Sequence, residues 1–337
     1  MRRWFVIACL SVACVSNAPP QPYYGGGGGG GGYQQQQDPE LLAAAQRDAI
    51  TRDGKLDDRT VDFVFDGGQL EFEMYRLGNR IVQTARSRYA VPVMVSWSLN
   101  ALENLRPVTM PTGVIMLPPA TQPLGLGPIV VLAELEQEDV TARYRRELSF
   151  RARFGDPGVQ PMDYHYALPF PRGQTFSVLQ GFHGAFSHRG SNEFAVDFDC
   201  PVATPVLAAR PGTVVVVNAK AQGSGTTPEF LDYARVNFVI VMHDDGTLGE
   251  YMHLAPATVQ VKPGQRVERG QELALSGNTG FSSTPHLHFQ VMTAGRDGLT
   301  AHSFPFTMAV AAGRVEEPTL AQRYTGWEPR ADAVPMR

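Results

Sequence analysis

The sequence predicts an all-β protein in which a β-sandwich-like accessory domain is followed by a compact domain built on an antiparallel β-sheet. Short apolar runs of strand length recur along most of the chain, and several alternate between apolar and polar residues with period two. Turn residues separate these runs, most clearly at Asp244-Asp245-Gly246-Thr247, which is typical of a hairpin. With 337 residues and a 43% hydrophobic composition, the chain is long enough and apolar enough for two packed domains.

Residues 1–18 predict an export signal. Met1-Arg2-Arg3 forms a basic end, and the apolar run after it is too short to span a membrane as a helix. Cys14 follows Ser11-Val12-Ala13, which resembles a lipoprotein box. Ser16-Asn17-Ala18 could instead serve an ordinary signal peptidase, but Pro19 after it is unfavourable. We expect export to the periplasm, cell envelope or extracellular space, and we favour a lipid anchor at Cys14.

The net charge and the cysteine content limit which partners and which disulfide bonds are expected. The formal net charge is −4, so neither nucleic acid nor an anionic membrane surface is expected as a partner, and any membrane attachment would come from the lipid anchor. The cysteines Cys9 and Cys14 lie in or at the edge of the signal, which leaves Cys200 without a disulfide partner. Cys200 is therefore predicted to be a small buried side chain.

Residues 19–45 predict a flexible linker, because Gly25–Gly32 and Gln34–Gln37 cannot bury enough surface to offset their ordering entropy. A short helix is expected over Glu40–Arg47.

Residues 46–165 form the predicted accessory domain, with strands expected at 61–65, 70–74, 91–97, 129–135 and 144–154. This region has no cluster of His, Cys or paired acids, so we favour a packing or positioning role, and His165 at its end is taken as structural or exposed.

Residues 166–312 form the second predicted domain, which is densely turned and is followed by a charged, proline-bearing tail at 313–337. Gly264 and Gly270 mark two tight corners of a small sheet. Strands are expected at 176–180, 193–199, 205–209, 212–217, 238–243, 247–254, 271–275 and 287–292.

Seven of the eight histidines fall in this second domain, and two of them are separated by a single residue. If Thr284–Gln290 is a strand, His286 and His288 project from one face while Leu287 and Phe289 point into the core. A His-x-His on a strand is a recurrent way to bring two ring nitrogens toward one metal ion. The tripeptide alone is weak evidence, so the rest of the domain must supply other ligands.

An acid and a third histidine would complete a zinc site. Catalytic zinc usually takes three protein ligands and leaves a fourth place for water, whose pKa falls toward neutrality. Asp197 and Asp199 alternate with apolar residues and so share one face of an expected strand, although a solvated sheet face explains that pattern equally well. The loop before this strand carries His188, which a turn could fold back onto Asp197.

Four ordered motifs surround these residues: Ser187-His188-Arg189-Gly190 with Ala195-Val196-Asp197-Phe198 and Pro201–Val214, then Tyr251-Met252-His253-Leu254, Ser276–Gly280 and Pro285–Phe289. In this order they resemble the lysostaphin-type, LytM-like zinc metalloendopeptidases, over roughly Pro169 to Val310. The resemblance implies a LytM-like peptidase domain with one Zn²⁺ per chain, held by His188, Asp197 and His288.

The resemblance also implies roles for two histidines beside the open coordination position. His286 is assigned as the base and His253 as orienter or oxyanion stabiliser, and exchange of the two roles stays open. The implied activity is hydrolysis of peptide bonds in peptidoglycan through a zinc-activated water. Two alternatives remain: a catalytically inactive binding module that activates another cell-wall hydrolase, and a general secreted zinc protease.

Two features depart from the family pattern. The gap from His188 to Asp197 is nine residues where many members have four, so His183 could compete as a ligand, although we favour His188. Ala203 stands where the family commonly has Gly before Thr-Pro-Val, and a positive φ at this position would strain Ala.

Three further residues are expected to contact substrate, and two further histidines are expected to lie outside the zinc site. Asn237, Tyr251 and Thr284 are expected to line the substrate cleft. His243 ends a strand at the hairpin and is expected to pack or to bond a carbonyl, and His302 has no partner motif.

Overall fold

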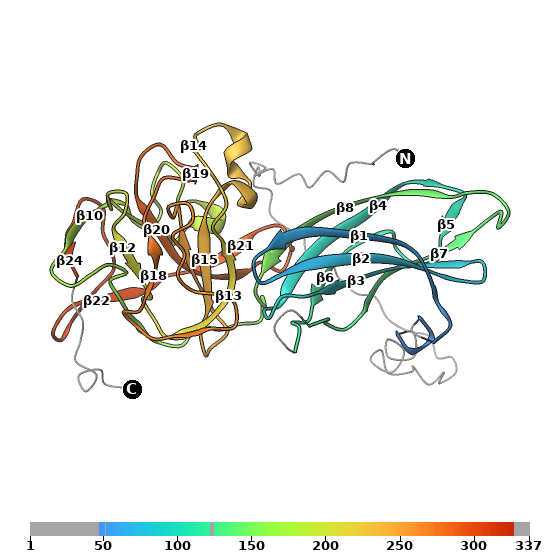
Figure 1. Cartoon of the computed structure of the whole chain (residues 1–337), viewed down its shortest axis with the longest axis horizontal. Helices are drawn as coiled ribbons and strands as arrows, with labels where there is room; N and C mark the ends of the chain where they lie inside the picture. The colour runs from blue at the N-terminus through green and yellow to red at the C-terminus, as the bar shows by residue number, and fades with distance from the viewer. Residues whose placement is uncertain (1–46, 51, 122–124, 327–337) are drawn as a thin grey trace, which may run out of the picture.

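The computed structural model describes residues 47–326, apart from residue 51 and residues 122–124. The expected signal and linker, all of the Glu40–Arg47 helix except Arg47, and residues 327–337 therefore lie outside the described residues. Figure 1 shows two β-rich lobes side by side along the long axis. The first lobe contains β1–β8 and the second β9–β24. Within the described part of the chain, no helix has the length and apolar character that a membrane span requires.

The first lobe is an antiparallel β-sandwich, which confirms the predicted architecture. One sheet has the strand order β1-β2-β3-β7-β5 and the other the order β6-β4-β8. The strands are β1 (Lys55–Phe65), β2 (Gly68–Leu77), β3 (Arg80–Ser87), β4 (Val93–Glu103), β5 (Leu105–Pro107), β6 (Thr112–Leu117), β7 (Val130–Gln137) and β8 (Arg145–Phe154).

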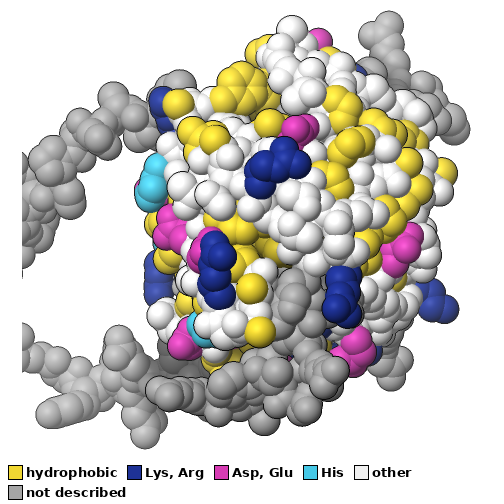
Figure 2. All heavy atoms as spheres, turned by 90° about the vertical axis from the view of Figure 1, so that its left-hand side faces the viewer, with side chains coloured by type: hydrophobic (Ala, Val, Ile, Leu, Met, Phe, Trp, Pro, Cys, Tyr) yellow, Lys and Arg dark blue, Asp and Glu magenta, His cyan; other side chains and the backbone are white. Residues whose placement is uncertain are grey.

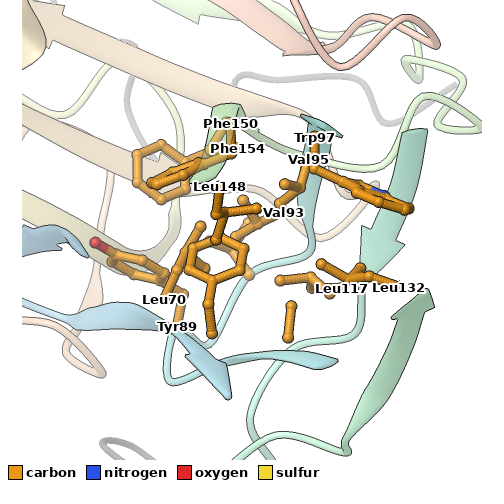
Figure 3. Close-up of a cluster of buried hydrophobic side chains, with 14 of the residues drawn as sticks. Leu70, Tyr89, Val93, Val95, Trp97, Leu117, Leu132, Leu148, Phe150 and Phe154 are labelled. Atoms are coloured by element: carbon orange, nitrogen blue, oxygen red, sulfur yellow. The ribbon is translucent and has the colours of Figure 1, made fainter. Parts of the chain in front are cut away.

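A single hydrophobic core fills the space between the two sheets (Figure 3). Alternate residues of β2, Leu70 and Phe72, are 0% exposed there, and Val93 and Val95 of β4 meet them from the other sheet. Full burial of each such side chain contributes about 1.5–3 kcal/mol relative to exposure. The period-two alternation in the sequence therefore reports the inner face of the sandwich correctly.

The sequence did not predict β3, because polar residues interrupt its apolar pattern. Gln83 and Thr84 are nevertheless buried, and both side chains donate hydrogen bonds to the backbone carbonyl of Glu73 on the neighbouring strand, at 3.1 and 3.2 Å. These bonds pair the donor groups of both side chains, although Oε1 of Gln83 is buried without a hydrogen-bond partner among the described residues. A periodicity of apolar residues cannot detect a strand that is stabilised in this way.

The second lobe is built on a sheet with the strand order β17-β13-β15-β16-β20-β11-β10-β24, and β21 also pairs with β20. Its strands are β9 (His165–Ala167), β10 (Thr175–Gln180), β11 (Val196–Phe198), β12 (Pro205–Leu207), β13 (Gly212–Asn218), β14 (Ser224–Gly225), β15 (Phe238–Met242), β16 (Leu248–Met252), β17 (Arg266–Val267), β18 (Glu272–Leu275), β19 (Gly280–Phe281), β20 (Leu287–Ala294), β21 (Ala301–Phe304), β22 (Thr307–Ala311), β23 (Arg314–Glu316) and β24 (Arg323–Thr325). Short 3₁₀ helices lie at Gly190–Asn192, Pro228–Leu231 and Tyr233–Arg235.

The hairpin predicted at Asp244-Asp245-Gly246-Thr247 is present. It joins β15 to β16, with Met242 paired to Leu248 across the turn. Gly246 has a φ of 81°, a conformation that glycine adopts at no steric cost. This hairpin places β16 beside β20 in the middle of the sheet.

Two predicted segments need correction. The strand expected over 193–199 is shorter, because residues 190–192 form a 3₁₀ turn and Glu193 keeps helical backbone angles, so β11 covers only Val196–Phe198. The segment from residue 313 to Thr325, predicted as an appended tail, is instead part of the folded second lobe. Its strand β23 pairs with β22, and its strand β24 pairs with β10. Tyr324 of β24 is buried in the second hydrophobic core. The division of the chain at residue 165 stays a prediction.

The two lobes meet through backbone and aromatic contacts. Asp66 and Val217 exchange two backbone hydrogen bonds, of 3.1 and 2.9 Å. Phe65 packs edge-on against Phe238, with ring centroids 5.4 Å apart. One continuous set of buried apolar residues therefore crosses from the sandwich into the back of the second sheet.

The end of the second lobe is shown as spheres in Figure 2. On this face Lys, Arg, Asp and Glu side chains are scattered among hydrophobic and uncharged ones, and no single-sign patch dominates.

Candidate metal centre

The His-x-His pair lies where β20 enters the main sheet. β20 begins at Leu287, and the backbone of His286 just before it still bridges to Gly277. Leu287 and Phe289 are 0% exposed and belong to the second core. His286 and His288 alternate with them and face Asp197 instead. The predicted alternation along this stretch is confirmed.

Asp197 lies directly opposite His288 on the neighbouring strand β11, where the Cα atoms of the two residues are register partners. Nδ1 of His288 is 2.9 Å from Oδ1 of Asp197. Val196 and Phe198 on either side of the aspartate are fully buried. A slip of one residue would turn Asp197 into the core, so the apolar neighbours specify where the carboxylate points.

His188 reaches the same point from the loop between β10 and β11. Its Nδ1 lies 2.9 Å from the carbonyl oxygen of Gly181, so this nitrogen carries the proton and donates. Its Nε2 lies 3.1 Å from Oδ2 of Asp197, is buried and has no partner with hydrogen-bond geometry among the described residues. A buried nitrogen with a free lone pair is suited to bind a metal ion.

His188, Asp197 and His288 therefore form one cluster, in which a ligand atom from each lies within 4.8 Å of the others. Two imidazoles and one carboxylate are a donor set that fits catalytic zinc. His183, the competing candidate, lies outside this cluster. Its side chain is 63% exposed, and its Nδ1 is 3.2 Å from Oε1 of Glu193. The geometry therefore favours His188 over His183.

The charges within this cluster are coupled. Burial alone would raise the pKa of Asp197, but its contacts with His188 and His288 hold that pKa well below its usual range. Burial lowers the pKa of His188, and the contact with Asp197 outweighs this effect and raises it. Asp197 is thus ionised, which is the state that a carboxylate needs in order to bind a divalent cation.

Two further histidines stand beside the cluster. The ring centroids of His253 and His286 are 4.4 Å apart, and Nε2 of His286 is 3.7 Å from Oδ1 of Asp197. Nδ1 of His253 is 2.7 Å from the carbonyl oxygen of Thr279, and Nδ1 of His286 is 2.8 Å from that of Thr284. Both Nδ1 atoms must be donors in these bonds, so Nε2 of each neutral ring is an acceptor.

His253 is held in an unusual environment. Its φ is 62°, in the left-handed region that residues other than glycine rarely occupy. Burial, and then the nearby rings of His286 and His288, lower the pKa of His253 to about 3. The metal-free protein therefore keeps His253 neutral at physiological pH.

The residues predicted to line the substrate cleft do not share one location. Asn237 and Tyr251 are 0% exposed. The amide of Asn237 is bonded to the backbone of Ala221 and Leu254, and the hydroxyl of Tyr251 accepts from the backbone N–H of Ala209. The prediction for these two is wrong, because internal bonds already occupy their polar groups.

Thr284, by contrast, is exposed next to the site. Its backbone carbonyl accepts the hydrogen bond from His286, which gives this residue a part in orienting that ring. A direct contact between the Thr284 side chain and substrate stays a prediction.

Other expected features of the second domain are present. Cys200 is a buried free thiol whose pKa is raised by burial. His243 is buried and packs edge-on against Tyr166 as expected, with ring centroids 5.6 Å apart, and its Nδ1 lies 3.0 Å from Oγ1 of Thr247. His302 is exposed and packs edge-on against Phe304. Ala203 has a φ of 71°, so the strained conformation considered from the sequence is present.

Sequence reasoning missed two residues near the cluster. Gln180, the last residue of β10, donates a hydrogen bond to Oδ2 of Asp197 at 2.8 Å. Phe186 is exposed in the His188 loop and stacks on Phe281 of β19, with ring centroids 6.0 Å apart. The only sequence signal for Gln180 was its place at the end of a strand that leads into the His188 loop. Nothing local indicated the aromatic contact.

Residues 191–298 match the family described as Peptidase family M23. This segment contains Asp197, His253, His286 and His288. It begins three residues after His188, so the place of His188 in the cluster rests on the geometry rather than on the match.

Similar proteins include the glycyl-glycine endopeptidase ALE-1 of Staphylococcus capitis, 34% identical over 140 residues, which are 41% of this chain and 35% of that protein. The peptidoglycan DD-endopeptidase ShyA of Vibrio cholerae serotype O1 is 35% identical over 100 residues, which are 30% of this chain and 20% of that protein. The solved catalytic domain of lysostaphin from Staphylococcus simulans is 28% identical, with 40% of this chain and 88% of that chain covered and a TM-score of 0.27. The chain thus spans about a third or less of the length of these two curated relatives.

Proposed function

We propose, on the premise that residues 191–298 belong to peptidase family M23, that this chain is a zinc-dependent endopeptidase that cleaves peptide bonds in peptidoglycan. The observation that carries the proposal is the convergence of His188, Asp197 and His288, with ligand atoms within 4.8 Å of one another. The names of two relatives, a glycyl-glycine endopeptidase and a peptidoglycan DD-endopeptidase, support the substrate class.

One zinc ion per chain would be held by Nε2 of His188, a carboxylate oxygen of Asp197 and Nδ1 of His288. These are the atoms that approach one another in the cluster. When bound, zinc supplies a water of lowered pKa and polarises the carbonyl of the scissile peptide. The ionised Asp197 would offset part of the charge of the ion, and the hydrogen bond from Nδ1 of His188 to Gly181 leaves Nε2 of that ring available as a ligand atom.

His286 is the proposed general base. Its Nε2 is an acceptor and lies near the cluster without belonging to it, so it can take the proton of the attacking water and later give it to the leaving amine. His253 is the proposed orienter. Because its Nδ1 donates to Thr279, the neutral ring accepts at Nε2, and this favours holding the water over donating to an oxyanion.

The same proposal places the protein outside the cytoplasm, at the cell envelope, because its substrate is a wall polymer and the chain starts with a signal-like segment. A lipid anchor at Cys14 would keep it at a membrane. The first lobe would act as a positioning module for the second, to which its core is joined.

The two alternative functions, an inactive binding module and a general secreted protease, require different residues or substrates at the site. An inactive module that activates another hydrolase needs no intact catalytic set, whereas all five positions of this chain carry the expected residues: His188, Asp197, His253, His286 and His288. A general secreted protease would use the same site on another substrate. The completeness of the set favours an enzyme, and substrate preference has to be measured.

The decisive experiment is mass spectrometry of muropeptides released from isolated sacculi by the full chain, with and without a chelator. We expect new amino termini that disappear when zinc is removed and return when it is added. Stoichiometric zinc without any release would favour the inactive binding module. Faster cleavage of elastin-like peptides than of sacculi would favour the general protease.

A further inference from the structure

Gln180 uses every hydrogen-bonding group of its side-chain amide within the candidate site. Its Nε2 donates to Oδ2 of Asp197 at 2.8 Å and to Oγ of Ser187 at 3.0 Å. Its Oε1 accepts from the backbone N–H groups of Phe186 and Ser187, at 3.1 and 3.2 Å. A carboxamide has two donor hydrogens and two acceptor lone pairs, so the side chain is fully satisfied.

These four bonds also determine the orientation of the amide. If the nitrogen and oxygen were exchanged, an N–H group would face two backbone N–H groups and the amide oxygen would face a carboxylate oxygen of Asp197. Both contacts would be repulsive. A carboxylate or an apolar side chain at position 180 could not satisfy the same set of partners.

The position of Gln180 explains how ligands nine residues apart in the chain are brought together. Ser187 and Phe186 directly precede His188, whose Nδ1 is bonded to Gly181, the residue after Gln180. Through its two ends, the amide thus ties the His188 loop to the carboxylate of Asp197. No pattern in the sequence indicated this tie.

Gln180 bonds Oδ2 of Asp197, the oxygen that also lies 3.1 Å from Nε2 of His188, and leaves Oδ1 without a bond to the amide. Oδ1 of Asp197 faces Nδ1 of His288 at 2.9 Å and Nε2 of His286 at 3.7 Å. Hydrogen bonds of this kind orient carboxylate ligands, and their loss typically weakens metal binding about 10- to 100-fold.

We propose that Gln180 is a positioning residue of the metal site, which sets the placement of His188 relative to Asp197 and thereby the affinity for zinc. The inference rests on the proposed function only in taking the His188, Asp197 and His288 cluster as the zinc site. It concerns metal binding and not the identity of the substrate.

The test uses the metal-free full chain with Gln180→Met, which fills a similar volume without donor or acceptor. The affinity for Zn²⁺ is measured by competition with a chromophoric chelator, and the melting temperature is measured without metal. We expect Gln180→Met to bind zinc about 10- to 100-fold more weakly. Gln260→Met is the matched control, because it removes an exposed amide–carboxylate hydrogen bond to Glu272 of the same lobe. Its zinc affinity should equal that of the wild type.

Ser187→Ala distinguishes the two acceptors of Nε2 of Gln180, which are Oγ of Ser187 and Oδ2 of Asp197. It removes one acceptor of the amide but leaves the bond from Gln180 to Asp197, so zinc affinity should stay close to that of the wild type. A Gln180→Met chain that does not fold with zinc present, or that binds zinc as tightly as the wild type, would overturn the inference. A wild-type chain that binds zinc but leaves sacculi intact would defeat the proposed function without affecting this result.

Discussion

The imidazole rings of His253 and His286 lie 4.4 Å apart between centroids, and neither belongs to the cluster formed by His188, Asp197 and His288. The Nδ1 atom of each ring lies within hydrogen-bond distance of a backbone carbonyl, so the main chain orients both rings. This arrangement separates groups that can transfer protons from groups that can hold an ion.

Replacement of His286 by Ala should abolish hydrolysis of sacculi while zinc content stays near one per chain. A positioned acid–base group contributes about 10²–10⁴-fold to rate, and His286 does not belong to the ligand cluster. Rates of muropeptide release and metal analysis of the same preparation check both halves. His302→Ala, which alters an exposed histidine of the same lobe, is the control. Loss of zinc from the His286→Ala chain would instead make His286 a ligand.

Asp197→Asn should lose zinc. The substitution keeps the size of the side chain but removes the negative charge that His188 and His288 surround, and a neutral amide is a poor ligand for zinc. Metal content after dialysis against a weak chelator measures the effect. Asp199→Asn, two residues away and exposed, should retain zinc. Stoichiometric zinc in the Asp197 variant would remove that residue from the proposed site.

Ala203→Gly should stabilise the protein. The φ of 71° at Ala203 lies in the left-handed region, which costs a residue with a Cβ about 1–2 kcal/mol, whereas the added freedom of Gly in the unfolded chain costs about 0.4–1 kcal/mol. The net gain should be about 1 kcal/mol, seen as a higher midpoint of urea unfolding for the metal-free chain.

The matched control for that change is Ala142→Gly, at an exposed position whose φ is not positive. It should be slightly destabilised, because only the unfolded state gains freedom. Equal effects of the two substitutions would show that strain at Ala203 is not the cause.

Buried His243 should make the folded state less stable as the solution becomes acidic. Burial, and then the charge of Arg210, lower its pKa from 6.5 to about 3, with Asp244, Asp245 and Arg266 also acting on the ring. Between these values the unfolded chain takes up a proton that the folded chain does not. Stability is therefore complete above pH 6.5 and falls as pH decreases toward 3, by up to about 1.4 kcal/mol per pH unit.

Unfolding of wild type and His243→Gln across that pH range checks the effect, because the difference between the two curves isolates this one ring. The variant should lose less stability than the wild type as the pH falls. His302→Gln serves as control and should follow the wild-type curve, since that histidine is exposed. Parallel curves for His243→Gln and wild type would contradict the assignment.

The order of the motifs and the alternation along single strands were readable from the sequence. Leu287 and Phe289 face the core and His286 and His288 the site, because the period of two is a property of the extended backbone. Segments without that alternation were missed or misjudged. β3 carries buried polar residues, and β24 is held in the main sheet by Tyr324.

The sequence by itself determined the all-β class and the residue types available for the site, because strand periodicity and ligand chemistry depend on neighbours in the chain. Only the tertiary structure decided that His188 rather than His183 approaches Asp197, that Gln180 joins them, and that the polar groups of Tyr251 and Asn237 are used internally. These outcomes depend on which backbone groups lie opposite a side chain after the loop closes. Such long-range hydrogen bonds leave no period and no motif in the sequence.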